Sequence, residues 1–88
     1  MTTPSDVAAW MVKELKQRRF LNQSQAVAEI ATEFGSDFVY FNRNHNRAIS
    51  PEVLAAFREL TGDDVVWERG SRCWRYRQPY DPPGRQAR

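Results

Sequence analysis

Residues 65–77 read VVWERGSRCWRYR, and this stretch decides the fold. β-Branched and aromatic residues are interleaved with charged ones, as in strands that bury one face, and Gly70-Ser71 lies at the centre. A two-residue turn at Gly70-Ser71 would place Trp67 opposite Trp74. The stretch therefore predicts a C-terminal β-hairpin whose tryptophans share one face and pack on a core rather than stack on bases.

The same hairpin is rich in arginine. Arg69, Arg72, Arg75 and Arg77 outnumber its single glutamate, Glu68. Arginine pairs well with phosphate, and exposed rings stack on bases, so nucleic-acid binding through this hairpin is one hypothesis.

A second basic segment, Lys16, Arg18 and Arg19, could join that surface. Positive charge also complements the carbonyl end of a helix, which explains these residues without any ligand. If the two basic segments share a continuous face, nucleic acid is favoured, whereas intervening acidic side chains disfavour it.

Three amphipathic helices are expected upstream of the hairpin. The first covers about residues 5–18 after an N-cap at Thr3. The second follows a two-residue apolar bridge at Phe20-Leu21, is capped by Asn22 or Ser24 and ends at Gly35. The third runs from Pro51 to Gly62. Its expected buried stripe consists of Val53, Leu54, Phe57 and Leu60.

A short hairpin is expected between the second and third helices. Residues 38–41 read FVYF, the asparagine-rich stretch 42–46 suits a turn, and residues 47–49 return. The aromatic side chains Phe38, Tyr40 and Phe41 are the candidate interaction residues, because apolar surface that a small domain leaves uncovered marks interfaces.

These elements predict an α+β fold of three helices with one or two antiparallel hairpins. The order is similar to a winged helix with a hairpin inserted between helices 2 and 3. We expect a single globular domain over residues 4–78 and a loose proline-rich tail over 79–88.

Composition limits the chemistry. The 88 residues carry a net charge of +2, one cysteine and one histidine. A single cysteine, Cys73, cannot form an intramolecular disulfide. Cys73 and His45 together are too few ligands for a zinc site of the usual kind. No catalytic motif, signal peptide or membrane-spanning run is visible. We expect a cytoplasmic protein that is not an enzyme and binds no metal or cofactor.

Several runs carry a family resemblance. They are FVYFN at residues 38–42, AI at 48–49, VLAAFRELT at 53–61, VVWER at 65–69 and WRYR at 74–77. Over about residues 7–77 the chain resembles a small bacterial family of uncharacterised proteins, relatives of which travel on mobile integron gene cassettes. The resemblance implies a cytoplasmic single-domain protein and supplies no activity.

The leading hypothesis for function is a non-catalytic interaction module, either a homodimer or a domain that docks on a protein partner. Nucleic-acid binding through the arginine-rich hairpin is the alternative.

Overall fold

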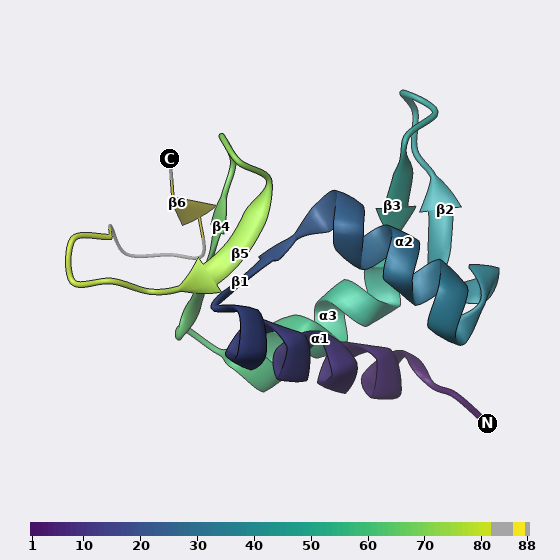
Figure 1. The fold of residues 1–88 in the computed structure, drawn as a ribbon, viewed down its shortest axis with the longest axis horizontal. Coiled ribbons are helices and arrows are strands. Elements are labelled where there is room, and N and C mark those ends of the chain that lie inside the picture. The colour runs from purple at the N-terminus through teal and green to yellow at the C-terminus, as the bar shows by residue number, and fades with distance from the viewer. Residues whose placement is uncertain (82–85, 88) are drawn as a thin grey trace.

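The computed structural model describes residues 1–81 and 86–87 and has the predicted α+β fold (Figure 1). Its elements in chain order are α1 (Pro4–Arg18), β1 (Phe20–Asn22), α2 (Gln23–Phe34), the 3-10 turn η1 (Ser36–Phe38), β2 (Val39–Phe41), β3 (Arg47–Ile49), α3 (Pro51–Thr61), β4 (Val65–Glu68), β5 (Cys73–Tyr76) and β6 (Gln86–Ala87).

Helix α1 begins where the sequence predicts. The Thr3 hydroxyl accepts the N–H of Asp6, while the Asp6 carboxylate accepts the N–H of Thr3, which closes a capping box ahead of Pro4. The helix ends at Arg19, whose backbone is left-handed with φ of 72° and whose N–H donates to the carbonyl of Leu15.

The Phe20-Leu21 bridge is a strand rather than a plain connection. β1 pairs antiparallel with β5, with Leu21 opposite Trp74, so the C-terminal hairpin gains a third strand in the order β1-β5-β4. Asn22 ends this strand and also caps α2, because its side chain accepts the N–H of Gln25 at 3.2 Å.

The register of the C-terminal hairpin is as predicted, with Trp67 opposite Trp74. The turn differs from the prediction. β4 ends at Glu68 and β5 begins at Cys73, so the turn has four residues instead of two. Its left-handed residue is Arg72, with φ of 54°, rather than Gly70. The Arg72 carbonyl accepts the N–H of Gln23 at 2.9 Å, which ties this turn to the start of α2.

The inserted hairpin of β2 and β3 forms as predicted, with Tyr40 opposite Ala48. Asn42 organises its turn, because its side-chain oxygen accepts the N–H groups of Asn44 and Asn46 at 2.9 and 3.1 Å. In Figure 1 this hairpin and the β4–β5 hairpin project on the same side of the molecule.

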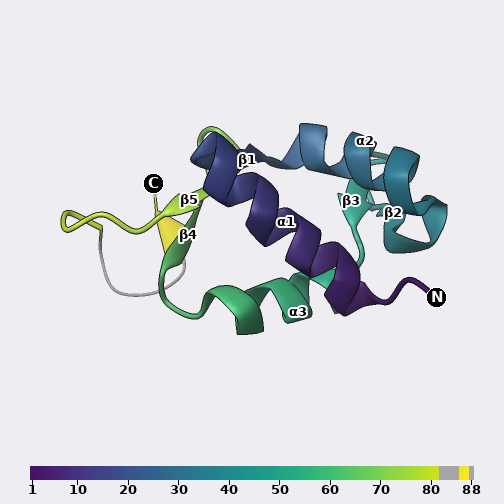
Figure 2. The ribbon, with the colours of Figure 1, turned by 60° about the horizontal axis from the view of Figure 1, so that its bottom comes forward.

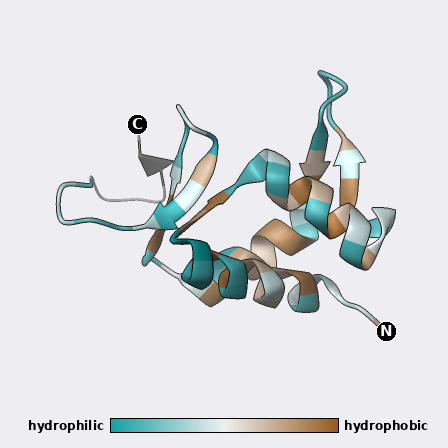
Figure 3. Cartoon of the chain, viewed as in Figure 1, coloured by the Kyte–Doolittle hydropathy of each residue, from teal (hydrophilic) through white to brown (hydrophobic). Residues whose placement is uncertain are grey.

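The core lies where α1 packs against α3 on one side and against α2 and β1 on the other, and Phe57 of α3 meets Trp74 of the sheet. In Figure 2, α1 lies diagonally across the molecule, with α2 on one side and α3 on the other. Figure 3 shows hydrophobic residues on the packed helices and hydrophilic ones at the tip of the β2–β3 hairpin. The fully covered side chains include Met11, Leu15, Leu21, Ile30 and Phe57.

The predicted stripe of α3 is partly wrong. Val53 and Phe57 are buried, whereas Leu60 is 56% exposed and Thr61 is buried in its place. Val53, Phe57 and Thr61 follow i, i+4, i+8 spacing, and the Thr61 hydroxyl donates to the carbonyl of Phe57, which makes its burial tolerable.

The expected loose tail falls partly outside the described residues, at 82–85 and 88. Of the remainder, Asp81 is bound by Arg75, and β6 pairs parallel with β4. Neither contact was expected from the sequence.

Candidate functional site

The three candidate interaction aromatics do not share one surface. Phe38 closes η1 and is buried in the core, at 9% exposed, which corrects its assignment as a surface residue. Its carbonyl accepts the N–H of Ser50 ahead of α3. Tyr40 and Phe41 are 46% and 69% exposed on β2. The exposed aromatic surface of this hairpin therefore comes from these two residues.

The four hairpin arginines have different environments. Arg75 is the most constrained: its Nε donates to Glu68 at 2.7 Å, and its two terminal nitrogens donate to the two Asp81 oxygens at 2.8 and 2.9 Å. The Tyr80 ring centroid lies 5.8 Å from the guanidinium carbon. Arg75 is thus a structural anchor for residues 78–81.

This anchor shifts the acidity of its members. The bidentate hydrogen bonds from Arg75, followed by the N–H of Gln78, lower the pKa of Asp81 to about 2. Arg75 and then Ser71 lower the pKa of Glu68, and the two carboxylates raise the pKa of Arg75. All three groups therefore stay charged at neutral pH.

The other three hairpin arginines lie in two places, at the end of β5 and in the turn before it. Arg77 donates its Nε to the carbonyl of Asp63, near the end of α3. Arg69 and Arg72 occupy the exposed turn.

The basic residues at the end of α1 are likewise divided. Arg18 donates to Glu14 at 2.8 Å and to both oxygens of Glu29 at 2.7 and 2.9 Å. The hydrogen bond from Arg18 lowers the pKa of Glu29. Lys16 and Arg19 are exposed. Carboxylates therefore lie inside both basic segments, at Arg18 and at Arg75, which weighs against a continuous phosphate-binding face.

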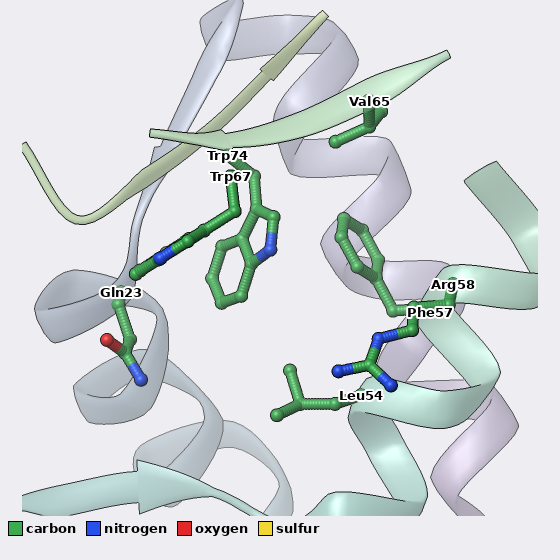
Figure 4. A pocket seen from close by; sticks show the side chains of 7 residues that line it. All are labelled: Gln23, Leu54, Phe57, Arg58, Val65, Trp67 and Trp74. Carbon is green, nitrogen blue, oxygen red and sulfur yellow. The ribbon is translucent and has the colours of Figure 1, made fainter. Parts of the chain in front are cut away.

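A pocket of about 430 Å³ with a partly apolar, aromatic lining lies between α3 and the C-terminal sheet (Figure 4). We call it the aromatic groove. Its lining residues come from α2, α3, β4 and β5, and are Gln23, Leu54, Phe57, Arg58, Val65, Trp67 and Trp74. Figure 4 shows both indoles descending from the strands, one reaching towards Gln23 at the start of α2 and the other facing Phe57 and Leu54 of α3, with the Arg58 guanidinium on the α3 side.

The floor of the aromatic groove is rigidly packed. The Trp67 and Trp74 ring centroids are 4.7 Å apart, and Phe57 meets Trp74 edge-on at 5.6 Å. Trp74 is 9% exposed, whereas Trp67 and Leu54 are half-buried. The sequence predicted that these residues pack together. Their pattern contained no signal that a groove remains between them.

Potential metal ligands do not cluster in the described part of the chain. No group of three or more His, Cys, Asp or Glu side chains there could hold a metal ion. Cys73 contacts the Ser71 carbonyl and the Asn22 side-chain amide. His45 lies at the tip of the β2–β3 turn with φ of 60°. No helix in residues 1–81 is long and apolar enough to cross a bilayer.

The chain matches the model of a known protein family. The model of the Family of unknown function (DUF6953) matches residues 3–76, which is most of the chain. The protein therefore belongs to this family, and the expectation of an uncharacterised family is confirmed at that level. No curated protein matches the chain, and no solved structure does.

Proposed function

We propose that this domain is a non-catalytic interaction module that docks on a protein partner through the aromatic groove. The observation that carries the proposal is the combination of a packed aromatic floor with an arginine at the rim. Partner proteins commonly insert one apolar or aromatic side chain into a well-packed pocket, which becomes desolvated in the complex.

The floor suits an apolar anchor. Phe57, Trp67 and Trp74 hold one another by ring contacts of 4.7 and 5.6 Å, so the groove is formed before any partner arrives. A preformed pocket loses little conformational entropy on binding. Its volume of about 430 Å³ is ample for one large side chain.

The rim suits an acidic neighbour of that anchor. Arg58 and Gln23 line the groove, and within the described residues the Arg58 side chain makes no ion pair. An arginine beside an apolar pocket forms strong charge-assisted hydrogen bonds with a carboxylate. We therefore infer a partner segment with an apolar anchor close to an aspartate or glutamate.

The topology supports a winged-helix-like interpretation. The chain runs through α1, β1, α2 and α3 to the β4–β5 hairpin, with β1 beside β5 and the β2–β3 hairpin inserted before α3. The exposed residues Glu52 and Glu59 on α3 would repel phosphate at the position where a helix-turn-helix protein reads DNA. This favours a protein partner over a nucleic acid at α3.

Peptide display tests the proposal. Random peptides selected on the wild-type domain should be enriched in an aromatic or aliphatic anchor with a carboxylate within a few residues. Arg58→Glu should weaken those peptides about tenfold or more, since it replaces an attractive charge with a repulsive one. Arg69→Glu, the same change outside the groove, is the matched control. Peptides that bind both variants alike, or no enrichment at all, would refute docking at the groove.

The proposal also includes the expectations about catalysis, cellular location and origin. The absence of a catalytic function rests on the absence of a catalytic motif in the sequence. A cytoplasmic location and a bacterial, cassette-borne origin are also proposed, in line with the family resemblance of residues 7–77.

A further inference from the structure

A second pocket lies on the side of the molecule where the two hairpins project. Its volume is about 440 Å³, and it opens between the two hairpin turns and the start of α2. We call it the polar pocket. Its polar lining includes Ser24, Asn42, Asn44, Asn46, Arg47 and Arg72, and no aspartate or glutamate lines it.

The fold brings these residues together from three separate segments. The hydrogen bond from the Gln23 N–H to the Arg72 carbonyl fixes the β4–β5 turn against α2. The Asn42 side-chain oxygen is occupied by the N–H groups of Asn44 and Asn46, which leaves its amide NH₂ group available as a donor. Arg47 begins the returning strand β3.

Several hydrogen-bond donors that line the polar pocket have no acceptor among the described residues. Within residues 1–81 and 86–87, neither the Arg47 nor the Arg72 guanidinium makes an ion pair or hydrogen bond, and the Ser24 hydroxyl makes none. This contrasts with Arg18 and Arg75, which are bound by carboxylates. Two cations beside hydroxyl and amide donors, without a lining carboxylate, match the chemistry of a phosphate group.

We propose that the polar pocket binds a phosphate group between Arg47 and Arg72, with Ser24 and the asparagine amides as further donors. The site lies beside the aromatic groove, with Gln23 in the lining of both, but phosphate binding does not depend on docking there. The phosphate belongs either to a small phosphate ester or to the backbone of a nucleic acid, and both present the same oxygens to the pocket.

The first experiment titrates the full chain with inorganic phosphate at constant ionic strength, followed by ¹H–¹⁵N NMR. Saturable shifts are expected at Ser24, Asn44 and Asn46. Arg47→Gln and Arg72→Gln should each weaken binding about tenfold, as expected for the loss of one charge-assisted contact.

Two matched controls separate a site from general charge. Arg43→Gln changes the same turn as the pocket asparagines, and Arg69→Gln changes the same turn as Arg72, but neither residue lines the pocket. Both controls should bind phosphate within about twofold of wild type, because screened charges at the surface contribute little. Non-saturable shifts, or an equal loss in all four variants, would overturn the proposal.

The second experiment distinguishes the source of the phosphate. A nucleoside monophosphate and a single-stranded oligonucleotide are compared on the same variants. A nucleic-acid ligand should bind the oligonucleotide more tightly, with a log-log salt slope near −0.7 per phosphate contacted. Oligonucleotide binding that ignores Arg47→Gln and Arg72→Gln would lie elsewhere and would refute a nucleic-acid role for this pocket. Leu54→Ala changes the aromatic groove without altering its charge and should leave phosphate binding unaltered. Failure of one proposal can therefore be distinguished from failure of the other.

Discussion

Trp74 connects three parts of the core. Its ring lies against Trp67 and Phe57, its backbone pairs with Leu21 in β1, and it is 9% exposed. Removing a large buried ring loses its transfer free energy and leaves a cavity.

Trp74→Ala should therefore lower the free energy of unfolding by about 3–5 kcal/mol, which is a large share of what a small domain has. Urea unfolding measures this loss. Trp67→Ala is the matched comparison and should cost less, because Trp67 is only half-buried. A loss below about 1 kcal/mol for Trp74→Ala would mean that the ring does not support the core.

The Arg75–Asp81 pair predicts a pH dependence. The pKa of Asp81 in the folded chain is about 2, below its ordinary value of 3.8, so its ionised form favours the folded state. That contribution is fully present above about pH 4 and is lost as the pH falls towards about 2. Glu68 acts in the same direction, because its pKa is also lowered.

Asp81→Asn should remove this component, so the variant should be less stable than wild type at neutral pH and approach it in acid. Urea midpoints of the two proteins across the acid range test the sign. Parallel curves down to about pH 2 would contradict a stabilising role for the ionised carboxylate.

At the scale of elements, the end of α1 offers a stabilising substitution. Arg19 has φ of 72°, a conformation that costs residues with a β-carbon about 1–2 kcal/mol and costs glycine almost nothing. Glycine also loses more entropy on folding, by about 0.5–1 kcal/mol.

Arg19→Gly should therefore raise the free energy of unfolding by up to about 1 kcal/mol. Lys13→Gly, at an exposed position inside the same helix, should lower it by about 1 kcal/mol. Urea unfolding of both variants provides the test. Destabilisation by Arg19→Gly would show that the Arg19 side chain contributes more than its backbone conformation costs.

The elements that the sequence predicted correctly are those with local causes. The capping residues at Thr3 and the proline at position 51 start α1 and α3, and the alternation around Trp67 and Trp74 sets the register. β1 was missed because three residues carry no periodicity, and it is a strand only because β5 lies beside it.

The length of the β4–β5 turn and the burial of Phe38 were mispredicted for a similar reason. The bond from Gln23 to Arg72 joins segments far apart in the chain, and the turn η1 rotates Phe38 into the core. Prediction of the candidate site was limited in the same way. The sequence shows where the arginines lie along the chain, but not which residues lie beside them in the fold. The tertiary fold places Arg75 against Asp81, whereas it places Arg72 in the lining of a pocket together with Arg47.

At the scale of the whole molecule, the two proposed sites adjoin. Gln23 lines both the aromatic groove and the polar pocket, at the start of α2. The short strand β1 places this residue there, because it leads directly into α2 while pairing with β5. An unpredicted three-residue strand thus determines where both pockets form.

The oligomeric state follows from the surface that remains uncovered. With Phe38 in the core, the β2–β3 hairpin offers Tyr40 and Phe41 on a strand of three residues. Stable interfaces bury about 1,200–2,000 Å² in total, more than two side chains and so short an edge provide. Of the two alternatives that the sequence left open, we therefore expect docking on a different protein rather than a homodimer.

Sedimentation equilibrium at micromolar concentration should accordingly give a single species near 10.3 kDa. A dimer that Phe41→Ser converts to a monomer would instead assign self-association to the exposed aromatics of the β2–β3 hairpin. Phe20→Ser is the control, since Phe20 is 52% exposed but lies on β1, away from that hairpin. A dimer that survives Phe41→Ser and dissociates with Leu54→Ala would place a second copy of the chain in the aromatic groove. The partner of the interaction module would then be the protein itself.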